Sequence, residues 1–486
     1  MNDLINLEEE LKRYFNYETF RVGQKEIITS VLDGSHTLAT LPTGSGKSIT
    51  YQLPALISSG ITVVVSPLIS LMFDQVKILK AKGIKRVAAL NSLMSYEQKQ
   101  QILNHLKHFK LLYCSPEMLQ QEWLINRLKS INVSYLVIDE AHCISQWGHE
   151  FRTDYLKLHS IYKQLDEPTV LALSATATPE VQVDIVGHLQ INMNKIIYPV
   201  DRPNITLATK KVEHQNEKEE YLIHLVENNR VPTMVYFSSR QVSEEVYQKL
   251  QAYFPDRRVA CYHGGMEQDE RLLIQQQFMY DQLDVICCTS AFGMGVDKSN
   301  IRLVVHYHMP STLESYIQEM GRAGRDGKHS LAVLIYQLGD ETIPFQLINS
   351  ELPNDLEIET FLQSNRNEEL IDPLTETKTK FLNFQLERNK TTETSEIASS
   401  IKNVRDHRLE VKKQNIFKML HWIHTKGCRR ESLYQSFQDG VENPINFCCD
   451  YCDFNLNQWS FLTSEEQKLN VLYDWEKRLN AIFNRR

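Results

Sequence analysis

LATLPTGSGKS (residues 38–48) joins an apolar strand to a glycine turn, and the helical segment 49–56 follows it. A turn of this kind presents backbone N–H groups and the positive end of the helix dipole to phosphate. Lys47 is expected to reach the β- and γ-phosphates of a nucleotide, and Ser48 to bind Mg²⁺. The usual pattern has glycine where this chain has Leu41, so the match is incomplete. The stretch predicts an α/β fold with a nucleotide site lined by Thr43, Gly44, Ser45 and Gly46.

A second apolar strand, 135–138, ends in Asp139-Glu140-Ala141-His142. Ligands bind at the carboxyl edge of open α/β sheets, so both carboxylates are expected beside the glycine turn. There Asp139 can hold Mg²⁺ through water, and Glu140 can orient and deprotonate the attacking water. The alternative is a solvated acidic pair at a strand end, and the upstream phosphate-binding turn argues against it.

Short apolar runs bounded by turn residues recur along the chain, with helical stretches between them. Runs of this length suit strands buried on both faces of a parallel sheet. They form two series separated by the break Asp201-Arg202-Pro203-Asn204, which predicts two tandem α/β domains with parallel sheets at residues 1–200 and 201–340. The runs are 37–41, 62–66, 110–114, 135–138 and 169–173, then 233–237, 258–262, 284–288, 303–307 and 331–336.

The second domain carries Gln-Glu-Met-Gly-Arg-Ala-Gly-Arg-Asp-Gly at residues 318–327, after a helical segment. Phosphoryl transfer needs positive charge beyond the γ-phosphate, where an arginine is worth roughly 10³ to 10⁵ in rate. The small residues allow Arg322 and Arg325 to approach a ligand closely. We expect Arg325, ahead of Arg322, to act as an arginine finger, with Gln318 in the same catalytic set. Solvated arginines are the alternative.

The composition excludes several classes of protein. Hydrophobic residues make up 42% and charged residues 23% of the 486, so most of the chain can bury cores. The apolar runs are too short to span a membrane, and the acidic first ten residues are unlike a secretory signal. We therefore expect a cytoplasmic protein without a membrane partner.

Charge is unevenly distributed along the chain. The net charge of −8 argues against a wholly basic surface, but residues 401–430 carry nine Lys or Arg and two acidic residues. We call residues 401–430 the basic segment. It is a candidate phosphate-contacting surface, and the alternative is a solvated helix face.

Four of the nine cysteines cluster near the end of the chain: Cys428, then Cys448-Cys449-Asp450-Tyr451-Cys452. Four thiolates suffice for a closed tetrahedral zinc site, and four reduced structural cysteines are the alternative. The other five lie in apolar runs and are expected to be buried thiols in a reducing compartment. We predict a helical connection and a small zinc-binding module at residues 341–455, then a helical tail at 456–486.

The motifs, in this order, resemble those of superfamily 2 helicases and specifically the RecQ family, over about residues 15–452. Residues 66–72 resemble a motif that contacts the DNA strand. Residues 174–178 resemble the motif that couples ATP hydrolysis to DNA binding. The spacing Cys-Arg-Arg followed by Cys-Cys-Asp-x-Cys is similar to the family's zinc modules.

Two further motifs favour RecQ over the RNA helicases that share the acidic box. Tyr17 with Phe20-Arg21-Val22-Gly23-Gln24 is similar to the family's adenine-recognition motif, which implies that Gln24 reads the base edge while Tyr17 and Arg21 flank the ring. Residues 143–152 resemble the family's aromatic-rich loop. Its side chains would contact DNA, with stacking by Trp147 and Phe151 and a phosphate contact from Arg152.

The resemblance implies two RecA-like lobes that use ATP, Mg²⁺ and Zn²⁺ to move 3′ to 5′ on single-stranded DNA and unwind duplexes in recombination and repair. Single-stranded and branched DNA, and single-strand-binding or recombination proteins, are the implied partners, with nucleoid association if the source is bacterial. Fuller members continue with winged-helix and HRDC domains. The 34 residues after Cys452 hold neither, so a short form is expected.

Two alternatives remain at this point. The first is an RNA helicase. The second is a DNA-binding or strand-annealing scaffold that uses ATP as a switch and unwinds weakly, which the lack of a winged helix favours. The polar stretch 339–400 has no predicted role.

Overall fold

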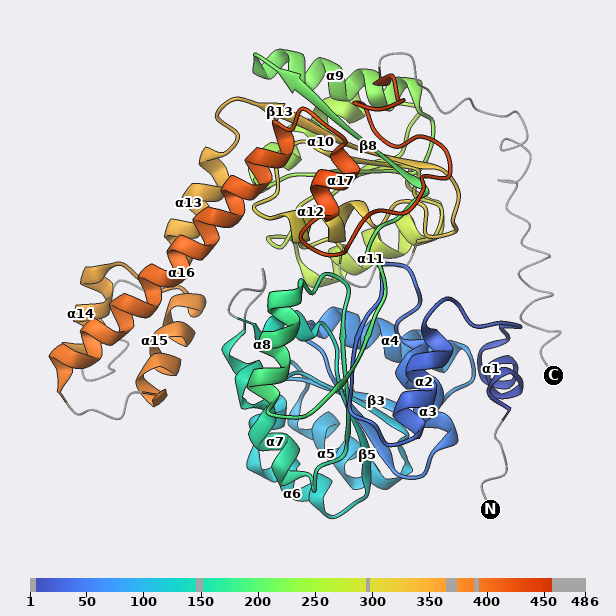
Figure 1. Ribbon diagram of the computed structural model, residues 1–486, viewed down its shortest axis with the longest axis vertical. Coiled ribbons are helices and arrows are strands. Elements are labelled where there is room, and N and C mark those ends of the chain that lie inside the picture. The colour runs from blue at the N-terminus through green and yellow to red at the C-terminus, as the bar shows by residue number, and fades with distance from the viewer. Residues whose placement is uncertain (1–5, 146–151, 294–297, 364–373, 389–392, 457–486) are drawn as a thin grey trace.

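The computed structural model describes residues 6–145, 152–293, 298–363, 374–388 and 393–456. Two α/β lobes lie one above the other, and a helical arm extends to one side from the second lobe (Figure 1). Both sheets are entirely parallel, with strand orders β3-β4-β2-β5-β6-β1-β7 and β10-β11-β9-β12-β13-β8. The predicted fold class, two RecA-like parallel sheets followed by a helical region with four cysteines, is confirmed.

In the first lobe, neighbouring strand residues point to opposite faces of the sheet, and both faces are buried. Leu136 packs with α5, α6, α7 and α8, whereas Val137 packs with α1, α2, α3 and α4. This two-sided burial explains the continuous apolar runs in the sequence. The elements are α1 (Leu7–Phe15), α2 (Gln24–Leu32), β1 (Thr37–Thr40), α3 (Ile49–Ile57), β2 (Ile61–Val65), α4 (Ile69–Ala81), β3 (Val87–Leu90), α5 (Tyr96–Asn104), η1 (Leu106–His108), β4 (Leu111–Cys114), η2 (Met118–Gln120), α6 (Glu122–Lys129), β5 (Val133–Ile138), η3 (Ala141–Ile144), η4 (Thr153–Lys157), α7 (Leu158–Gln164), β6 (Thr169–Ser174), α8 (Pro179–Leu189) and β7 (Asn194–Ile197).

The second lobe repeats this layering, but its two faces have different coverings. Val305 lies on the face covered by α9 and α10, and Val304 on the face covered by α11 and α12. The second of these faces also buries Trp422 and Cys449 from the end of the chain. The elements are β8 (Ile205–Val212), α9 (Gln215–Asn228), β9 (Thr233–Tyr236), α10 (Arg240–Tyr253), β10 (Val259–Tyr262), α11 (Gln268–Met279), β11 (Val285–Cys288), β12 (Leu303–His306), α12 (Leu313–Met320) and β13 (Ser330–Gln337).

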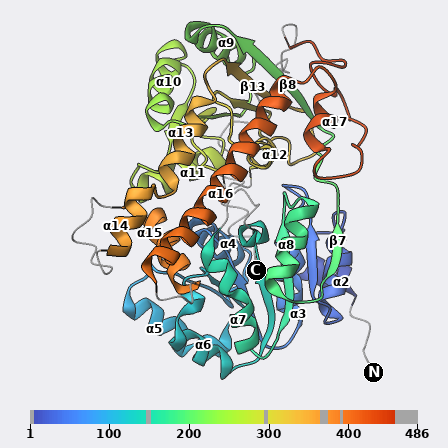
Figure 2. The same ribbon diagram turned by 60° about the vertical axis from the view of Figure 1, so that its left-hand side comes forward.

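The remaining described residues form the helical arm and a short module that returns to the second lobe (Figure 2). The arm has its own small core, which includes Ile358, Leu382 and Ile401. We call residues 424–456, which hold the four cysteines, the cysteine module. The arm consists of α13 (Thr342–Glu351), α14 (Asp355–Gln363), α15 (Glu376–Arg388) and α16 (Thr394–Ile423), and the module contains α17 (Arg429–Tyr434).

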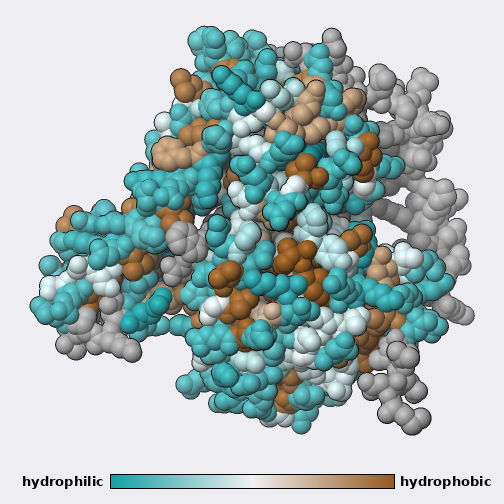
Figure 3. Space-filling view, viewed as in Figure 1, coloured by the Kyte–Doolittle hydropathy of each residue, from teal (hydrophilic) through white to brown (hydrophobic). Residues whose placement is uncertain are grey.

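Most described residues of the polar stretch 339–400 are thus helical, and short non-helical segments lie at 339–341 and 352–354. The domain boundaries near residues 200, 340 and 455 stay predictions, and nearly all of the predicted tail at 456–486 lies outside the described residues. Among the described helices, none combines the length and apolar character needed to cross a bilayer. The face of the molecule in Figure 3 is mainly hydrophilic, with separate small hydrophobic patches.

Candidate functional site

The phosphate-binding loop, residues 41–48, connects β1 to α3 at the carboxyl edge of the first sheet. Gly44 and Gly46 have φ of 79° and 75°, a left-handed conformation that favours glycine. A Cβ atom at Gly44 would lie 2.8 Å from Cγ of Arg325. The two glycines therefore allow both the tight turn and the close approach of the second lobe.

The interior of this loop suits a polyanion. Burial lowers the pKa of Lys47, while Glu140 and Asp139 act in the opposite direction. Ser45 Oγ is buried and has no hydrogen-bond partner among the described residues. A phosphate group bound here would give both side chains an acceptor, so the loop fits the phosphates of a nucleotide.

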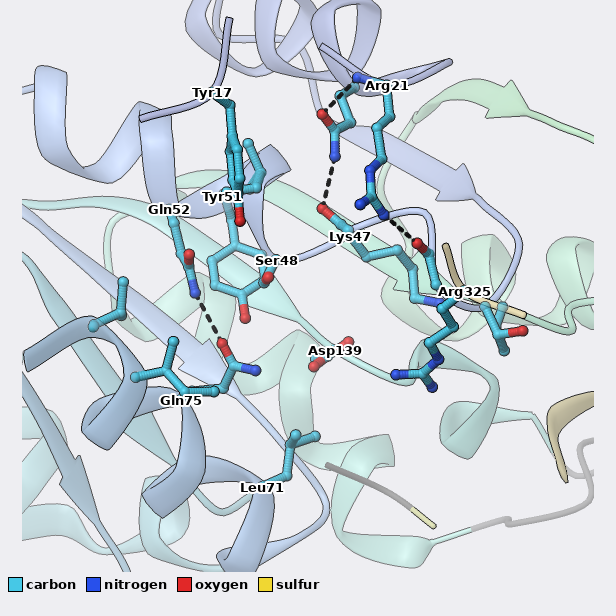
Figure 4. Close-up of a pocket in the computed structure, with 18 of the residues that line it drawn as sticks. Tyr17, Arg21, Lys47, Ser48, Tyr51, Gln52, Leu71, Gln75, Asp139 and Arg325 are labelled. Carbon is cyan, nitrogen blue, oxygen red and sulfur yellow. Dashed lines mark hydrogen bonds between the residues drawn. The ribbon is translucent and has the colours of Figure 1, made fainter. Parts of the chain in front are cut away.

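The acidic pair lies directly after β5, on the same lobe as Lys47. Burial raises the pKa of Asp139, and Lys47 opposes that shift; Asp139 Oδ1 accepts a hydrogen bond from the Glu140 amide at 3.0 Å. Glu140 has φ of 49°, which is costly for a non-glycine residue and is typical of active sites. Ser48 and Asp139 both line the cleft, so together they offer the oxygen ligands that Mg²⁺ prefers (Figure 4).

His142 links the acidic pair to the motif at residues 174–178. Its Nδ1 lies 3.4 Å from Glu140 Oε2 and 3.2 Å from Ser174 Oγ. Ser174 Oγ also accepts a hydrogen bond from the Thr176 amide at 3.3 Å. A movement of residues 174–178 would therefore shift His142 and, through it, change the position of the Glu140 carboxylate.

The second lobe contributes the opposite wall of the cleft. Gln318 lies near the end of α12, and Arg322 and Arg325 lie in the following turn, residues 321–327, which we call the arginine turn. Arg322 donates to the Gly293 carbonyl, whereas Arg325 extends toward Lys47 (Figure 4). All the residues predicted to be catalytic thus line one cleft: Lys47, Glu140, Gln318, Arg322 and Arg325.

The predicted adenine-recognition residues also line the cleft, but their hydrogen bonds differ from the expectation. Gln24 Nε2 donates to the Ser45 and Gly46 carbonyls at 2.8 and 3.0 Å. Arg21 Nη1 donates to the Gly44 carbonyl at 2.5 Å. Both side chains therefore hold the phosphate-binding loop in this structure, and reading of a base edge by Gln24 stays a prediction.

Tyr17 also lines the cleft, and its aromatic side chain is 47% exposed. Lys82 Nζ lies 3.3 Å from the Tyr17 hydroxyl and 5.0 Å from the centre of its ring. Lys82, with the hydrogen-bonded Gln52 and Gln75, lines the cleft without having been predicted. Gln52 lies in α3, Gln75 in α4 and Lys82 directly after α4, and their sequence carries no motif that would single them out.

Of the predicted DNA-contacting residues, Trp147 and Phe151 lie outside the described part of the chain. Arg152 donates to the Pro67 carbonyl at 2.9 Å. Pro67 belongs to the predicted strand-contacting motif at residues 66–72, so Arg152 lies beside that motif.

The four clustered cysteines converge as predicted. Their Sγ atoms all lie within 4.8 Å of one another, and Cys428–Cys448 and Cys449–Cys452 are each 3.6 Å apart. Tetrahedral thiolates at the usual zinc distance are about 3.8 Å apart. The donor set and its spacing therefore fit Zn²⁺.

Most of the basic segment is occupied by structural ion pairs. The exceptions include Lys413, Lys418 and Lys426, which form no ion pair with any described residue. The phosphate-contacting surface expected here is therefore reduced to a few side chains. The pairs are Lys402–Glu359, Arg405–Asp355, Lys412–Glu351, Arg429–Asp450 and Arg430–Asp201.

Comparison with known proteins gives matches over nearly the whole chain. Residues 21–184 match the family model described as DEAD/DEAH box helicase, and residues 217–327 match the helicase conserved C-terminal domain. The chain is 40% identical to the probable ATP-dependent DNA helicase RecS of Bacillus subtilis, over 99% of this chain and 98% of that protein.

The ATP-dependent DNA helicase RecQ of Bacillus subtilis is 45% identical over 68% of this chain, but the match spans only 56% of that protein. Among solved structures, the DEAD-box helicase Mss116 bound to single-stranded RNA superposes with a TM-score of 0.60 at 17% identity, over 88% of this chain and 89% of that one. The similarity to Mss116 concerns the fold alone.

Proposed function

Because the chain belongs to the RecQ family of DEAD/DEAH-box helicases, we propose that it is an ATP-dependent DNA helicase that moves 3′ to 5′ on single-stranded DNA. Duplex unwinding in recombination and repair is part of the proposal, with polarity and pathway taken from the family resemblance. The observation that carries it is the cleft in which Lys47 and Glu140 of one lobe face Arg325 of the other.

The residues of the cleft have separate roles in hydrolysis. Lys47 compensates the charge of the β- and γ-phosphates, and Glu140 orients a water molecule and accepts its proton as the water attacks the γ-phosphorus. The bond to the bridging oxygen breaks, which releases ADP and phosphate. Arg325, with Arg322, stabilises the charge on the transferring group. Ser48 and, through water, Asp139 would hold Mg²⁺, which would supply further charge neutralisation.

Hydrolysis is coupled to movement because the cleft is shared by the two lobes. Thr43 Oγ1 donates to the Gly321 carbonyl at 3.1 Å across it, so the lobes approach each other where the phosphates would sit. Nucleotide binding would favour this closed arrangement and product release would relax it. The link from Glu140 through His142 to Ser174 is a route by which a bound strand alters the catalytic end of the cleft.

A structural zinc ion in the four-cysteine site completes the proposal. Four thiolates leave no open position for a water molecule, so the ion would hold the cysteine module together and take no part in the chemistry. Single-stranded and branched DNA are the proposed substrates.

The test measures ATP hydrolysis with single-stranded DNA, with RNA of the same sequence and with neither. DNA should stimulate hydrolysis strongly and RNA weakly; equal stimulation by RNA would contradict a DNA helicase. Strand displacement is then compared on duplexes with a 3′ or a 5′ single-stranded tail. Only the 3′-tailed duplex should be unwound, and ATP-dependent DNA binding without displacement would favour the scaffold alternative.

A further inference from the structure

Arg202 joins the two sides of the cleft. Its Nη1 donates to the Thr43 carbonyl in the phosphate-binding loop at 2.7 Å and to the Gly321 carbonyl at 3.0 Å. Its Nη2 donates to the Ala323 and Gly324 carbonyls at 3.3 and 2.7 Å. One guanidinium group therefore holds the phosphate-binding loop against the arginine turn that carries Arg325. A planar, forked cation is suited to this task.

The backbone that carries Arg202 is held by the cysteine module. Asp201 is buried and forms an ion pair with Arg430, which lies two residues after Cys428. Arg430 also donates to the Arg202 carbonyl at 3.2 Å. Gln438 Oε1 accepts from the amides of Val200 and Asp201 at 2.8 and 3.2 Å. The backbone of residues 200–202 and the Asp201 carboxylate thus share several hydrogen bonds with a segment more than two hundred positions away in the chain.

The zinc-site cysteines themselves touch the strand that follows. The Leu207 amide in β8 donates to the Cys448 carbonyl at 3.2 Å, and the Asp450 amide donates to the Leu207 carbonyl at 3.0 Å. The module is therefore attached to the chain on the carboxyl side of Arg202 as well. A rigid module would hold residues 200–207 in one position.

We propose that Arg202 is a positioning residue for ATP hydrolysis, which fixes the phosphate-binding loop relative to the arginine turn, and that the cysteine module fixes Arg202. This inference rests on the proposed function and adds a route from the zinc site to the ATP site. Arg202 acts through Thr43 and the arginine turn, so it affects the alignment of Arg325 more than the affinity for nucleotide.

The first test compares Arg202→Gln and Arg202→Lys with the wild-type chain. Misplacement of a catalytic group by about 1 Å can cost on the order of 10²-fold, so both variants should lose about 10- to 100-fold in kcat. Affinity for a fluorescent ADP analogue should change less than about threefold, because Lys47 remains. Lysine should not rescue, because one ammonium group cannot reach four carbonyls in this fork geometry.

Arg230→Gln is the matched control, because Arg230 is an exposed arginine that forms an ion pair with Asp256 away from the cleft. The wild-type rate is measured first, and its absence would overturn the proposed helicase function. A normal wild-type rate with normal kcat in Arg202→Gln would overturn only the positioning role. Loss of nucleotide binding with unchanged kcat would overturn it as well.

The second test concerns the module. Gln438→Ala removes contacts to residues 200 and 201 but leaves the cysteines and the buried Arg430–Asp201 pair in place. Like Arg202→Gln, it should lower kcat, and the variant should retain one zinc ion per chain. Combined with Arg202→Gln, it should add little further loss, because the two changes act through one path. Independent, multiplying losses, or no loss in Gln438→Ala, would overturn the link to the module.

Small-angle X-ray scattering gives a reading that is independent of activity. With a non-hydrolysable ATP analogue and Mg²⁺, Arg202→Gln should have a larger radius of gyration than the wild type, since the lobes lose the guanidinium that joins them. Arg230→Gln should match the wild type. Identical radii for wild type and Arg202→Gln would show that Arg202 does not hold the lobes together, whatever the ATPase result.

Discussion

Lys47 and Glu140 act at different steps of the proposed reaction, and two substitutions separate them. Lys47→Ala and Glu140→Gln should both abolish DNA-stimulated ATP hydrolysis, with Glu140→Gln losing at least about 10²-fold as a general base does. Glu140→Gln should still bind ATP, because the phosphate-binding loop is intact. Steady-state hydrolysis and nucleotide binding measure the two effects, and near-normal turnover in either variant would contradict the assignment of this cleft.

Arg325 and Arg322 differ in their surroundings, which makes their roles distinguishable. Arg325→Ala should lose about 10³-fold or more in kcat while ATP affinity stays within a few-fold, since a finger acts on the transition state. Arg322 is tied to the Gly293 carbonyl, so Arg322→Ala should also lower the melting temperature. Rapid-quench hydrolysis and thermal unfolding check both; unchanged kcat in Arg325→Ala would refute the finger.

The sequence located the cleft well but could not supply its hydrogen bonds. Lys47 and Glu140 could be placed together because loops at the carboxyl ends of parallel strands share one edge of the sheet. Gln24 and Arg152 could be singled out by their motifs, but their backbone partners depend on tertiary packing. Arg202 gave no signal beyond its place in a domain break, because all four of its acceptors are carbonyl groups, which are the same in every sequence.

Among the strands, all ten apolar runs expected from the sequence are confirmed, and three described strands were missed. β3 is a short edge strand, Val-Ala-Ala-Leu, with weak β propensity. β7 is an edge strand that is mostly exposed, so it lacks an apolar run. β8 begins directly after the domain break, and Lys210 and Lys211 lie near its end. These features made its buried first half hard to recognise as a strand from the sequence. Strands that lie at sheet edges carry the weakest sequence pattern.

Apolar residues of the cysteine module, among them Leu433, Tyr434 and Phe437, pack into the core of the second lobe together with the fully buried Cys449. Zinc-coupled folding is worth on the order of 10 kcal/mol in small modules. Cys449→Ser should therefore yield protein with less zinc, a lower melting temperature and protease sensitivity that extends into the second lobe. Elemental analysis and limited proteolysis are the measurements.

Tyr451→Ser is a suitable control for this change, because Tyr451 lies between the ligands but is 60% exposed. It should keep one zinc ion per chain. A stably folded wild-type protein without stoichiometric zinc, and with four titratable thiols in this region, would refute the metal site.

Over the molecule as a whole, the net charge of −8 means that phosphate contacts have to come from local basic side chains, and three lysines of the basic segment form no ion pair with any described residue. Lys413→Ala, Lys418→Ala and Lys426→Ala should each lower the slope of log affinity for single-stranded DNA against log salt by about 0.7 if the residue contacts one phosphate. Lys402→Ala and Lys412→Ala are matched controls from the same helix. They should leave the slope unchanged, since both are already in ion pairs. Fluorescence anisotropy titrations at several salt concentrations measure the slope for each variant and for the two controls.

The ion pairing of the basic segment with α13 and α14 could not have been predicted from the residues of that segment alone. Three of its carboxylate partners, Glu351, Asp355 and Glu359, lie in α13 and α14, about fifty positions earlier in the chain. Only the antiparallel return of α16 along the arm brings them together (Figure 1). A run of positive charge thus identified a surface but not how much of it stays available.

The contact between β8 and the cysteine module has a consequence for biosynthesis. β8 pairs with β13 on one side, and its other side is capped by a parallel bridge from Leu207 to Cys449. The pairing of β8 with β13 is complete only after Gln337 has been made, and about 110 further residues must be synthesised before Cys449, so the ribosome-bound chain carries an uncapped strand edge over that interval. Such edges recruit other chains. If zinc orders the module, as proposed above, zinc shortage in the cell would prolong that interval and should increase aggregation of newly made protein.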